Sequence, residues 1–202
     1  MTLHVFAEEA SFKEFSKHLF ARLIPDVDVR IYPHQGKHDL EKALQTTLPT
    51  ISKIPDARIL VTRDQDSDDC RDLKQRLLDL IAGKCFCVCK IRIVCRELEC
   101  WMLGDLKAIA KAYPRFKPEK YQYKADFKEV DMIADAPERL LRIIPELKQN
   151  KRLPKMAFAN QVAPYMNVDT NKSVSFGHFI TAIRQLTSQN IKSKNDTYSS
   201  LE

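Results

Sequence analysis

The sequence lacks the features of membrane and secreted proteins. No apolar run approaches the roughly 18 residues that a bilayer-spanning helix needs. The first residues show no basic stretch followed by an apolar segment and a small-residue cleavage site, which a secretory signal requires. We therefore expect a cytoplasmic protein that does not bind a membrane.

Paired cysteines, clustered histidines and internal repeats are absent as well. The six cysteines include Cys85, Cys87 and Cys89, whose alternate spacing differs from the pairs about two to four residues apart that hold structural zinc. The five histidines show no spacing of a ligand set. Free cysteine is among the most buried residue types, so we expect reduced thiols in the core.

Positive charge is concentrated in one segment. The chain of 202 residues has a net charge of +6, and residues 107–155, with 13 Lys and Arg against 7 Asp and Glu, carry an equal excess. Such a segment can hold a polyphosphate that acidic residues would repel. A solubilising surface explains the charge equally well.

Short apolar strands alternate with amphipathic helices in the N-terminal half. Strands are predicted at 3–7, 27–32, 58–62 and 86–94, with helices at 8–24, 37–48, 69–81 and from 98 onward. This alternation predicts parallel strands with helices on both faces of the sheet. We expect an α/β domain over residues 1–112.

The second half, from residue 113, has no predicted strand. Prolines and a Lys/Tyr-rich stretch precede helices predicted at 137–147, 155–166 and 175–187. Asn171 and Ser173 are the two candidates for the N-cap of the last helix. We expect a helical extension over residues 113–188, packed on the first domain, and a flexible polar tail at 189–202.

Acidic residues follow the first and third predicted strands. Glu8 ends the first strand, and Asp64, Asp66, Asp68 and Asp69 follow the third. The carboxyl ends of parallel strands share one edge of a sheet, and carboxylates are ligands that Mg²⁺ prefers. Asp68 or Asp69 also fits an N-cap, but a cap needs only one Asp. We predict Glu8, Asp64 and Asp66 as catalytic metal ligands and Asp68 as a further ligand.

Further charged residues are predicted at the same edge. Glu97 and Glu99 begin the helix after the fourth strand, Glu97 as a catalytic base and Glu99 as a metal ligand. The alternative is that one of them interacts with the helix N-terminus and the other is solvated. Lys37, Arg63 and Arg96 are candidates for substrate binding, although either arginine could instead orient carboxylates.

Other polar residues receive no catalytic role. Trp101 is predicted to lie in the core, because it belongs to the apolar face of its helix. Lys155 and Ser175 belong to the helical extension, where capping and packing explain most polar side chains. We therefore assign neither of them to the site.

The order of the carboxylates distinguishes among α/β folds. Haloacid-dehalogenase-like phosphatases carry D-x-D after the first strand, and response-regulator receivers need a phospho-acceptor Asp after the third strand and a later Lys. Here Glu8 follows the first strand and Asp64-Gln-Asp66 the third. This order resembles the Toprim domain of topoisomerases, primases and overcoming-lysogenization-defect (OLD) nucleases.

More motifs look like those of an uncharacterised bacterial family with a Toprim-like, Rossmann-like fold. They are Val5-Phe-Ala-Glu8, His34-Gln-Gly-Lys37, Arg96-Glu-Leu-Glu-x-Trp101 and Asn171-x-Ser-x-Ser. Genes of this family often neighbour an ABC- or AAA-type ATPase in defence islands. Glu9 departs from the general Toprim pattern, which has Gly at this position.

The resemblance implies a Mg²⁺-dependent nuclease, with Mn²⁺ as a substitute metal, that acts on nucleic acid in anti-phage defence. It implies an ATPase partner and is compatible with a homo-oligomer. A second hypothesis is a non-catalytic adaptor that keeps the fold to bind an ATPase or nucleic acid. A third is nucleotidyl transfer of the primase kind.

Overall fold

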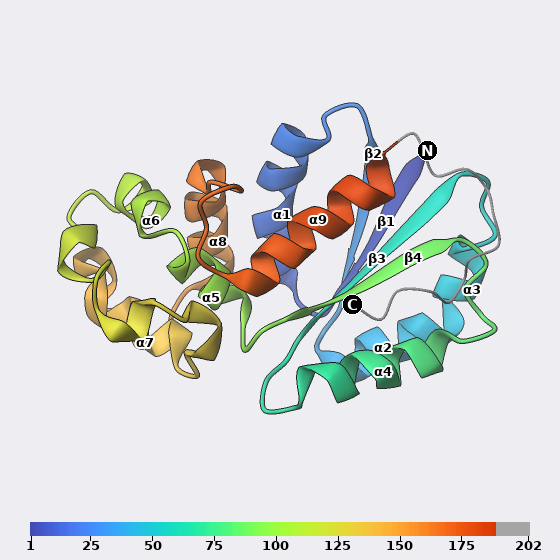
Figure 1. The fold of residues 1–202 in the computed structure, drawn as a ribbon, viewed down its shortest axis with the longest axis horizontal. Coiled ribbons are helices and arrows are strands. Elements are labelled where there is room, and N and C mark those ends of the chain that lie inside the picture. The colour runs from blue at the N-terminus through green and yellow to red at the C-terminus, as the bar shows by residue number, and fades with distance from the viewer. Residues whose placement is uncertain (189–202) are drawn as a thin grey trace.

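The computed structural model describes residues 1–188, and a four-stranded sheet forms its centre (Figure 1). The strand order is β2-β1-β3-β4, and every neighbouring pair is parallel. The strands are β1 (Thr2–Ala7), β2 (Asp28–Pro33), β3 (Ala57–Asp64) and β4 (Val88–Val94). The predicted α/β fold class is therefore confirmed, while the tail predicted at 189–202 lies outside the described residues.

Helices cover both faces of the sheet (Figure 1). One face carries α2 (Lys37–Thr46), α3 (Leu48–Ile51) and α4 (Cys70–Ile81), and the other carries α1 (Ala10–Leu23) and α9 (Val174–Thr187). Side chains alternate across a strand. Leu3 and Val5 therefore join the apolar cluster beneath α1, whereas Phe6 joins the cluster beneath α2 and α4.

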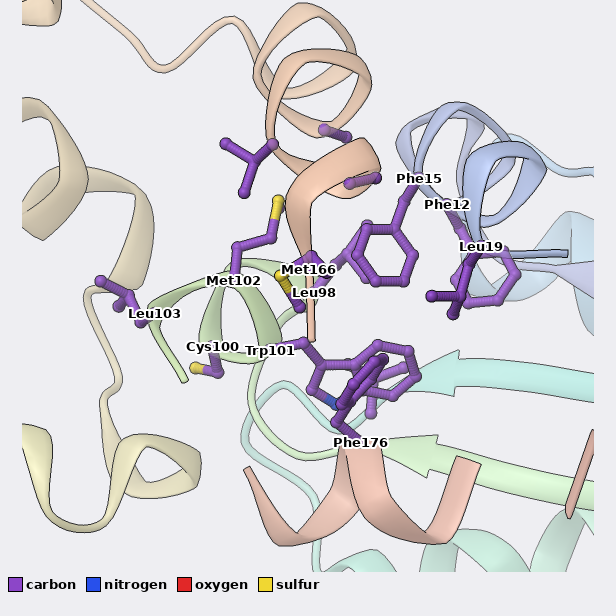
Figure 2. Packing of buried hydrophobic residues seen from close by; sticks show 14 of the residues in the cluster. Phe12, Phe15, Leu19, Leu98, Cys100, Trp101, Met102, Leu103, Met166 and Phe176 are labelled. Carbon is purple, nitrogen blue, oxygen red and sulfur yellow. The ribbon is translucent and has the colours of Figure 1, made fainter. Parts of the chain in front are cut away.

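An aromatic group fills the core between α1, α9 and the sheet. Figure 2 shows Phe12 and Phe15 of α1 beside Trp101 and Phe176, and all four side chains are buried. The indole Nε1 of Trp101 donates a hydrogen bond to Ser175 Oγ at 2.6 Å. Trp101 is thus a core residue, as predicted, and its polar atom has the partner that burial requires.

The helix predicted from residue 98 is divided in two, which corrects the expectation of one amphipathic helix. α5 (Leu98–Leu103) ends at Gly104, and α6 (Leu106–Ala112) begins after Asp105, whose carboxylate caps it by accepting from Ala108 N at 3.0 Å. A Cβ on Gly104 would lie 2.1 Å from Asn171 Oδ1. Only glycine allows this close approach of the segment before α9.

The second half forms a helical lobe and then returns to the sheet (Figure 1). The lobe contains α7 (Ala136–Ile143), α8 (Lys155–Val162) and short 3₁₀ turns at Pro118–Lys120, Ala125–Phe127, Val130–Met132, Pro145–Leu147 and Ala163–Tyr165. α8 packs on α1, and α9 packs along β4. Ser173 is the N-cap of α9, because its Oγ accepts from Phe176 N.

The cysteines fit the expectation of reduced core thiols in part. All six cysteines are free, as predicted, but only Cys100 is buried and the other five are half-buried. Within residues 1–188, no helix combines the length and the apolar character needed to cross a membrane.

Candidate functional site

Glu8 and Asp64 lie side by side at the carboxyl edge of the sheet. β1 and β3 are neighbours and Ala7 is paired with Thr62, so Glu8 and Asp64 both follow this pair, one residue apart in register. Glu8 Oε2 accepts a hydrogen bond from the backbone N–H of Asp64 at 3.0 Å. Burial raises the pKa of Glu8, although the nearby Arg63 guanidinium and this hydrogen bond oppose the rise.

Asp64 is surrounded by carboxylates from two other elements. Burial raises the pKa of Asp64 well above its usual range, and the negative charges of Glu9, Glu99 and Glu8 add to the effect. The Lys155 ammonium acts in the opposite direction. Carboxylates that raise one another's pKa favour a bound cation or proton, because like charges destabilise one another when partly removed from water.

Glu97, Glu99 and Lys155 form the second part of the site. Glu97 precedes α5 and Glu99 lies in its first turn, while Lys155 begins α8 in the helical lobe. Lys155 Nζ lies 2.8 Å from Glu97 Oε2 and 3.4 Å from Glu99 Oε2. Burial lowers the pKa of Lys155, but the two carboxylates outweigh it and the net pKa is raised.

Glu99 is the most deeply buried carboxyl group of this site. Its side chain is 0% exposed, and neither oxygen has a hydrogen-bond partner. Burial raises the pKa of Glu99 to about 7, and the Lys155 ammonium is too weak an opposing influence to prevent it. At neutral pH this carboxyl can therefore gain or lose a proton, as a general acid or base does.

Two residues in the loops after β3 and β4 have left-handed backbone. Asp66 has φ 54° and Arg96 has φ 59°, a backbone region that residues other than glycine seldom adopt. The loops are joined by hydrogen bonds from Asp66 N to Arg96 O at 3.2 Å and from Arg96 N to Gln65 Oε1 at 3.1 Å. Strain of this kind is common at functional sites, where the surrounding structure maintains it.

The remaining predicted residues lie at different depths. Arg63 is 1% exposed, and its guanidinium lies 3.6 Å from Glu8 and 3.8 Å from Asp68. From this position Arg63 can orient the carboxylates of Glu8 and Asp68, which is one of the two roles predicted for it. Asp68 also binds Arg76 at 2.9 Å. Lys37 is exposed at the first position of α2, beside the same edge.

Asp69, the last Asp of the run after β3, has a structural role. Its carboxylate accepts from the N–H groups of Arg71 and Asp72 and caps α4. Of the two cap candidates, Asp68 and Asp69, the structure thus selects Asp69. The remaining acidic residues after β3 are not needed to cap this helix.

The donor set suits a hard divalent cation such as Mg²⁺. Within residues 1–188, no three carboxyl, imidazole or thiol groups converge as ligands of one ion. Mg²⁺ does not require this, because one or two protein carboxylates, retained waters and substrate phosphates usually complete its shell. Glu8 and Asp64 are adjacent, and the buried oxygens of Glu99 have no hydrogen-bond donor. These oxygens fit a cation ligand.

Sequence reasoning missed two residues of this edge. Glu9 contributes to the electrostatic field at Asp64 and Lys155. It was noted only as a departure from the Toprim pattern. Lys155 is predicted to serve only capping or packing in the helical extension, whereas the structure places it in contact with Glu97, 58 positions away. No local pattern encodes such a pair.

Comparisons with known proteins agree with the fold. Two structures of the C-terminal region of the Xanthomonas campestris pv. campestris OLD protein, phased with iodine and platinum, match with TM-scores of 0.51 and 0.45. Each is 18% identical, and the match covers 91% of this chain and 94% of the other. At this identity the likeness concerns the fold alone, and only the match with a TM-score of 0.51 bears on it.

The sequence itself matches a family model over most of its length. No functionally curated protein matches it. The model of a domain of unknown function, DUF4276, matches residues 7–184, from the end of β1 to within α9. This range includes every residue of the acidic edge described above. The chain therefore belongs to the DUF4276 family.

Proposed function

We propose that this protein hydrolyses phosphodiester bonds in nucleic acid with the help of Mg²⁺ or Mn²⁺. The observation that carries the proposal is the gathering of carboxylates at the carboxyl edge of the sheet, where Glu8 accepts from Asp64 N and Glu99 shares Lys155 with Glu97. Parallel α/β sheets bind ligands at this edge. A cation offsets the repulsion between the carboxylates and also attracts a phosphate.

Each residue of the acidic edge would have a role that follows from its position. Glu8 and Asp64 would hold the cation, and Asp66 and Glu99 would become further ligands only if their side chains move toward it, since no three ligand groups within residues 1–188 converge as they stand. When bound, the cation supplies a nucleophilic water at neutral pH and neutralises charge on the phosphoryl oxygens. The Lys155 ammonium, 33% exposed, can hold a phosphate oxygen beside Glu97. Glu99, whose pKa is about 7 in the absence of a cation, would give up its proton to become a ligand.

The adaptor hypothesis explains the site less well. A protein that only binds a partner gains nothing from a wholly buried Glu99 whose oxygens have no hydrogen-bond donor. Burying a carboxyl whose only partner is an ammonium at 3.4 Å is costly, so a surface without chemical function is expected to lose it. Nucleotidyl transfer shares the same acidic residues and differs in its product, which would lengthen with added nucleotides.

The test is nuclease activity of the purified chain with Mg²⁺ or Mn²⁺. Single-stranded and double-stranded DNA and RNA are incubated with wild type, Glu8→Gln and Asp64→Asn. We expect wild type to cut at least one of these substrates. Each variant should lose activity by about tenfold to a hundredfold or more, as changes around a catalytic metal do. Asp79→Asn, an exposed carboxyl in the last turn of α4, is the control and should keep wild-type activity.

A binding measurement separates loss of chemistry from loss of fold. Mn²⁺ binding, followed by electron paramagnetic resonance, should weaken in Asp64→Asn and remain in Asp79→Asn. The proposal is wrong if all nucleic acids stay intact and Asp64→Asn binds Mn²⁺ as wild type does. We extend the proposal to an ATPase partner in phage defence. The assay is therefore repeated with an ABC- or AAA-type ATPase added, chosen from the neighbourhood of the gene if one is encoded there.

A further inference from the structure

β2 is an edge strand whose outer side has no neighbour among the described residues. It pairs with β1 on one side and ends the strand order. Its charged residues, Asp28 and Arg30, are 53% and 60% exposed and form an ion pair with each other at 3.2 Å. Its apolar residues Val29 and Ile31 are only half-buried. An edge strand of this kind offers backbone groups to another strand.

The register of β1 and β2 determines which backbone groups point outward. His34 N donates to Ala7 O, so the even-numbered residues of this segment direct their amide and carbonyl groups to β1. N–H and C=O groups of successive residues alternate between the two sides of a strand. Val29 and Ile31 therefore direct theirs to the free side.

A groove whose lining residues are mostly apolar runs beside this free edge. It is lined by Phe20, Ala21 and Ile24 at the end of α1 and by Val27, Val29 and Ile31. Its volume is about 260 Å³, below the ~300 Å³ at which ligand pockets usually begin. The groove therefore suits a few apolar side chains of a neighbouring protein better than a small molecule.

The charges on β2 make the strand complementary to itself. If β2 pairs with β2 of a second copy in antiparallel fashion about a two-fold axis, the residues whose backbone N–H and C=O point to the free side must occupy the hydrogen-bonded positions. If the two-fold axis passed through Arg30, the two Arg30 side chains would face each other. If it passed through Ile31, Pro33, which has no N–H, would lie opposite the partner's Val29 at a hydrogen-bonded position. Centring on Val29 sets Asp28 opposite the partner's Arg30 twice.

We propose that β2 pairs with β2 of a second copy of this chain, antiparallel and centred on Val29. The pairing joins two sheets into one of eight strands, counted from four in each chain. Side chains of Val27, Val29 and Ile31 from both copies meet on the face covered by α1, so each groove is closed by the other copy. Lys17, at the rim, is already paired with Glu14.

The oligomeric state of the full chain tests the proposal. Sedimentation velocity over a concentration series should give twice the mass of one chain for wild type. Arg30→Glu sets a carboxylate opposite the partner's Asp28 at two positions, and should weaken dimerisation about tenfold or more. Combining Asp28→Arg with Arg30→Asp exchanges the charges and should restore the dimer. This rescue is specific to the register centred on Val29.

A backbone variant gives an independent measurement. Val29→Pro removes an outward N–H at the two-fold axis and leaves the hydrogen bonds to β1 in place, so it should give a folded monomer. Val29→Ala keeps the N–H and should remain dimeric. Circular dichroism checks that each variant is folded. The proposal is overturned if wild type is monomeric up to about 100 µM, well above typical dimer affinities, or if the charge exchange fails to restore the dimer.

Discussion

Glu99→Gln should make the metal-free protein more stable at alkaline pH. Glu99 is wholly buried, and its pKa is raised from 4.5 to about 7, chiefly by burial. The folded protein therefore keeps this proton to a higher pH than the unfolded chain does. Stability is favoured while the group is protonated, below about pH 4.5, and is lost as the pH rises through about 7.

The size of the effect follows from the shift. Each pKa unit corresponds to about 1.4 kcal/mol, so the raised pKa of Glu99 costs about 3 kcal/mol at pH 8. At pH 5 the cost is below about 1 kcal/mol, because most of the folded protein still carries the proton. Glutamine has the shape of the protonated acid and does not titrate. The variant should therefore gain about 3 kcal/mol over wild type at pH 8 and little at pH 5.

Urea unfolding with a chelator present, at pH 5 and pH 8, measures this difference. Glu138→Gln, an exposed carboxyl on α7, is the control and should follow the pH profile of wild type. Equal pH dependence in wild type and Glu99→Gln would refute the reasoning. Adding Mg²⁺ gives a further readout, because a cation at the site favours ionised Glu99 and should reduce the advantage of the variant.

Three further substitutions, near the end of α5 and on α9, test local packing and pairing by urea unfolding. Gly104→Ala should cost about 1–3 kcal/mol, because its Cβ would overlap Asn171; unchanged stability would show that this approach is loose. Ser173→Ala removes the N-cap of α9 and should cost about 1–2 kcal/mol. Arg184→Ala breaks an ion pair exposed on both sides and should change stability by under about 0.5 kcal/mol. A larger loss would contradict that assignment.

The sheet and the position of its acidic edge could be predicted from the sequence. Strands of alternating or continuous apolar character recur between amphipathic helices. This alternation predicts parallel strands, whose carboxyl ends lie at one edge of the sheet. Glu8 and Asp64 therefore lie together, as the strand positions require. Asp69 as cap of α4 and Ser173 as cap of α9 were among the candidates, because capping is a local preference.

The rest depends on contacts between distant residues. Periodicity predicted a single helix from residue 98, but Asp105 caps a new helix and Gly104 accommodates Asn171, a residue from another segment. The depth of Glu99 was also not predictable, since it arises from the elements packed around α5. Lys155 belongs to a helix with no distinguishing motif, and only the packing of α8 on α1 brings it to the site.

The pairing of Lys155 with Glu97 also bears on how the family can diversify. The ion pair joins the two ends of a long excursion of the chain, and parts of that excursion are highly exposed, such as Tyr123, which is 83% exposed. Doubling the length of a flexible loop costs only about 0.6 kcal/mol. Insertions near Tyr123 are therefore compatible with an unchanged ion pair between Lys155 and Glu97. Relatives can thus vary this exposed segment and keep the same ion pair.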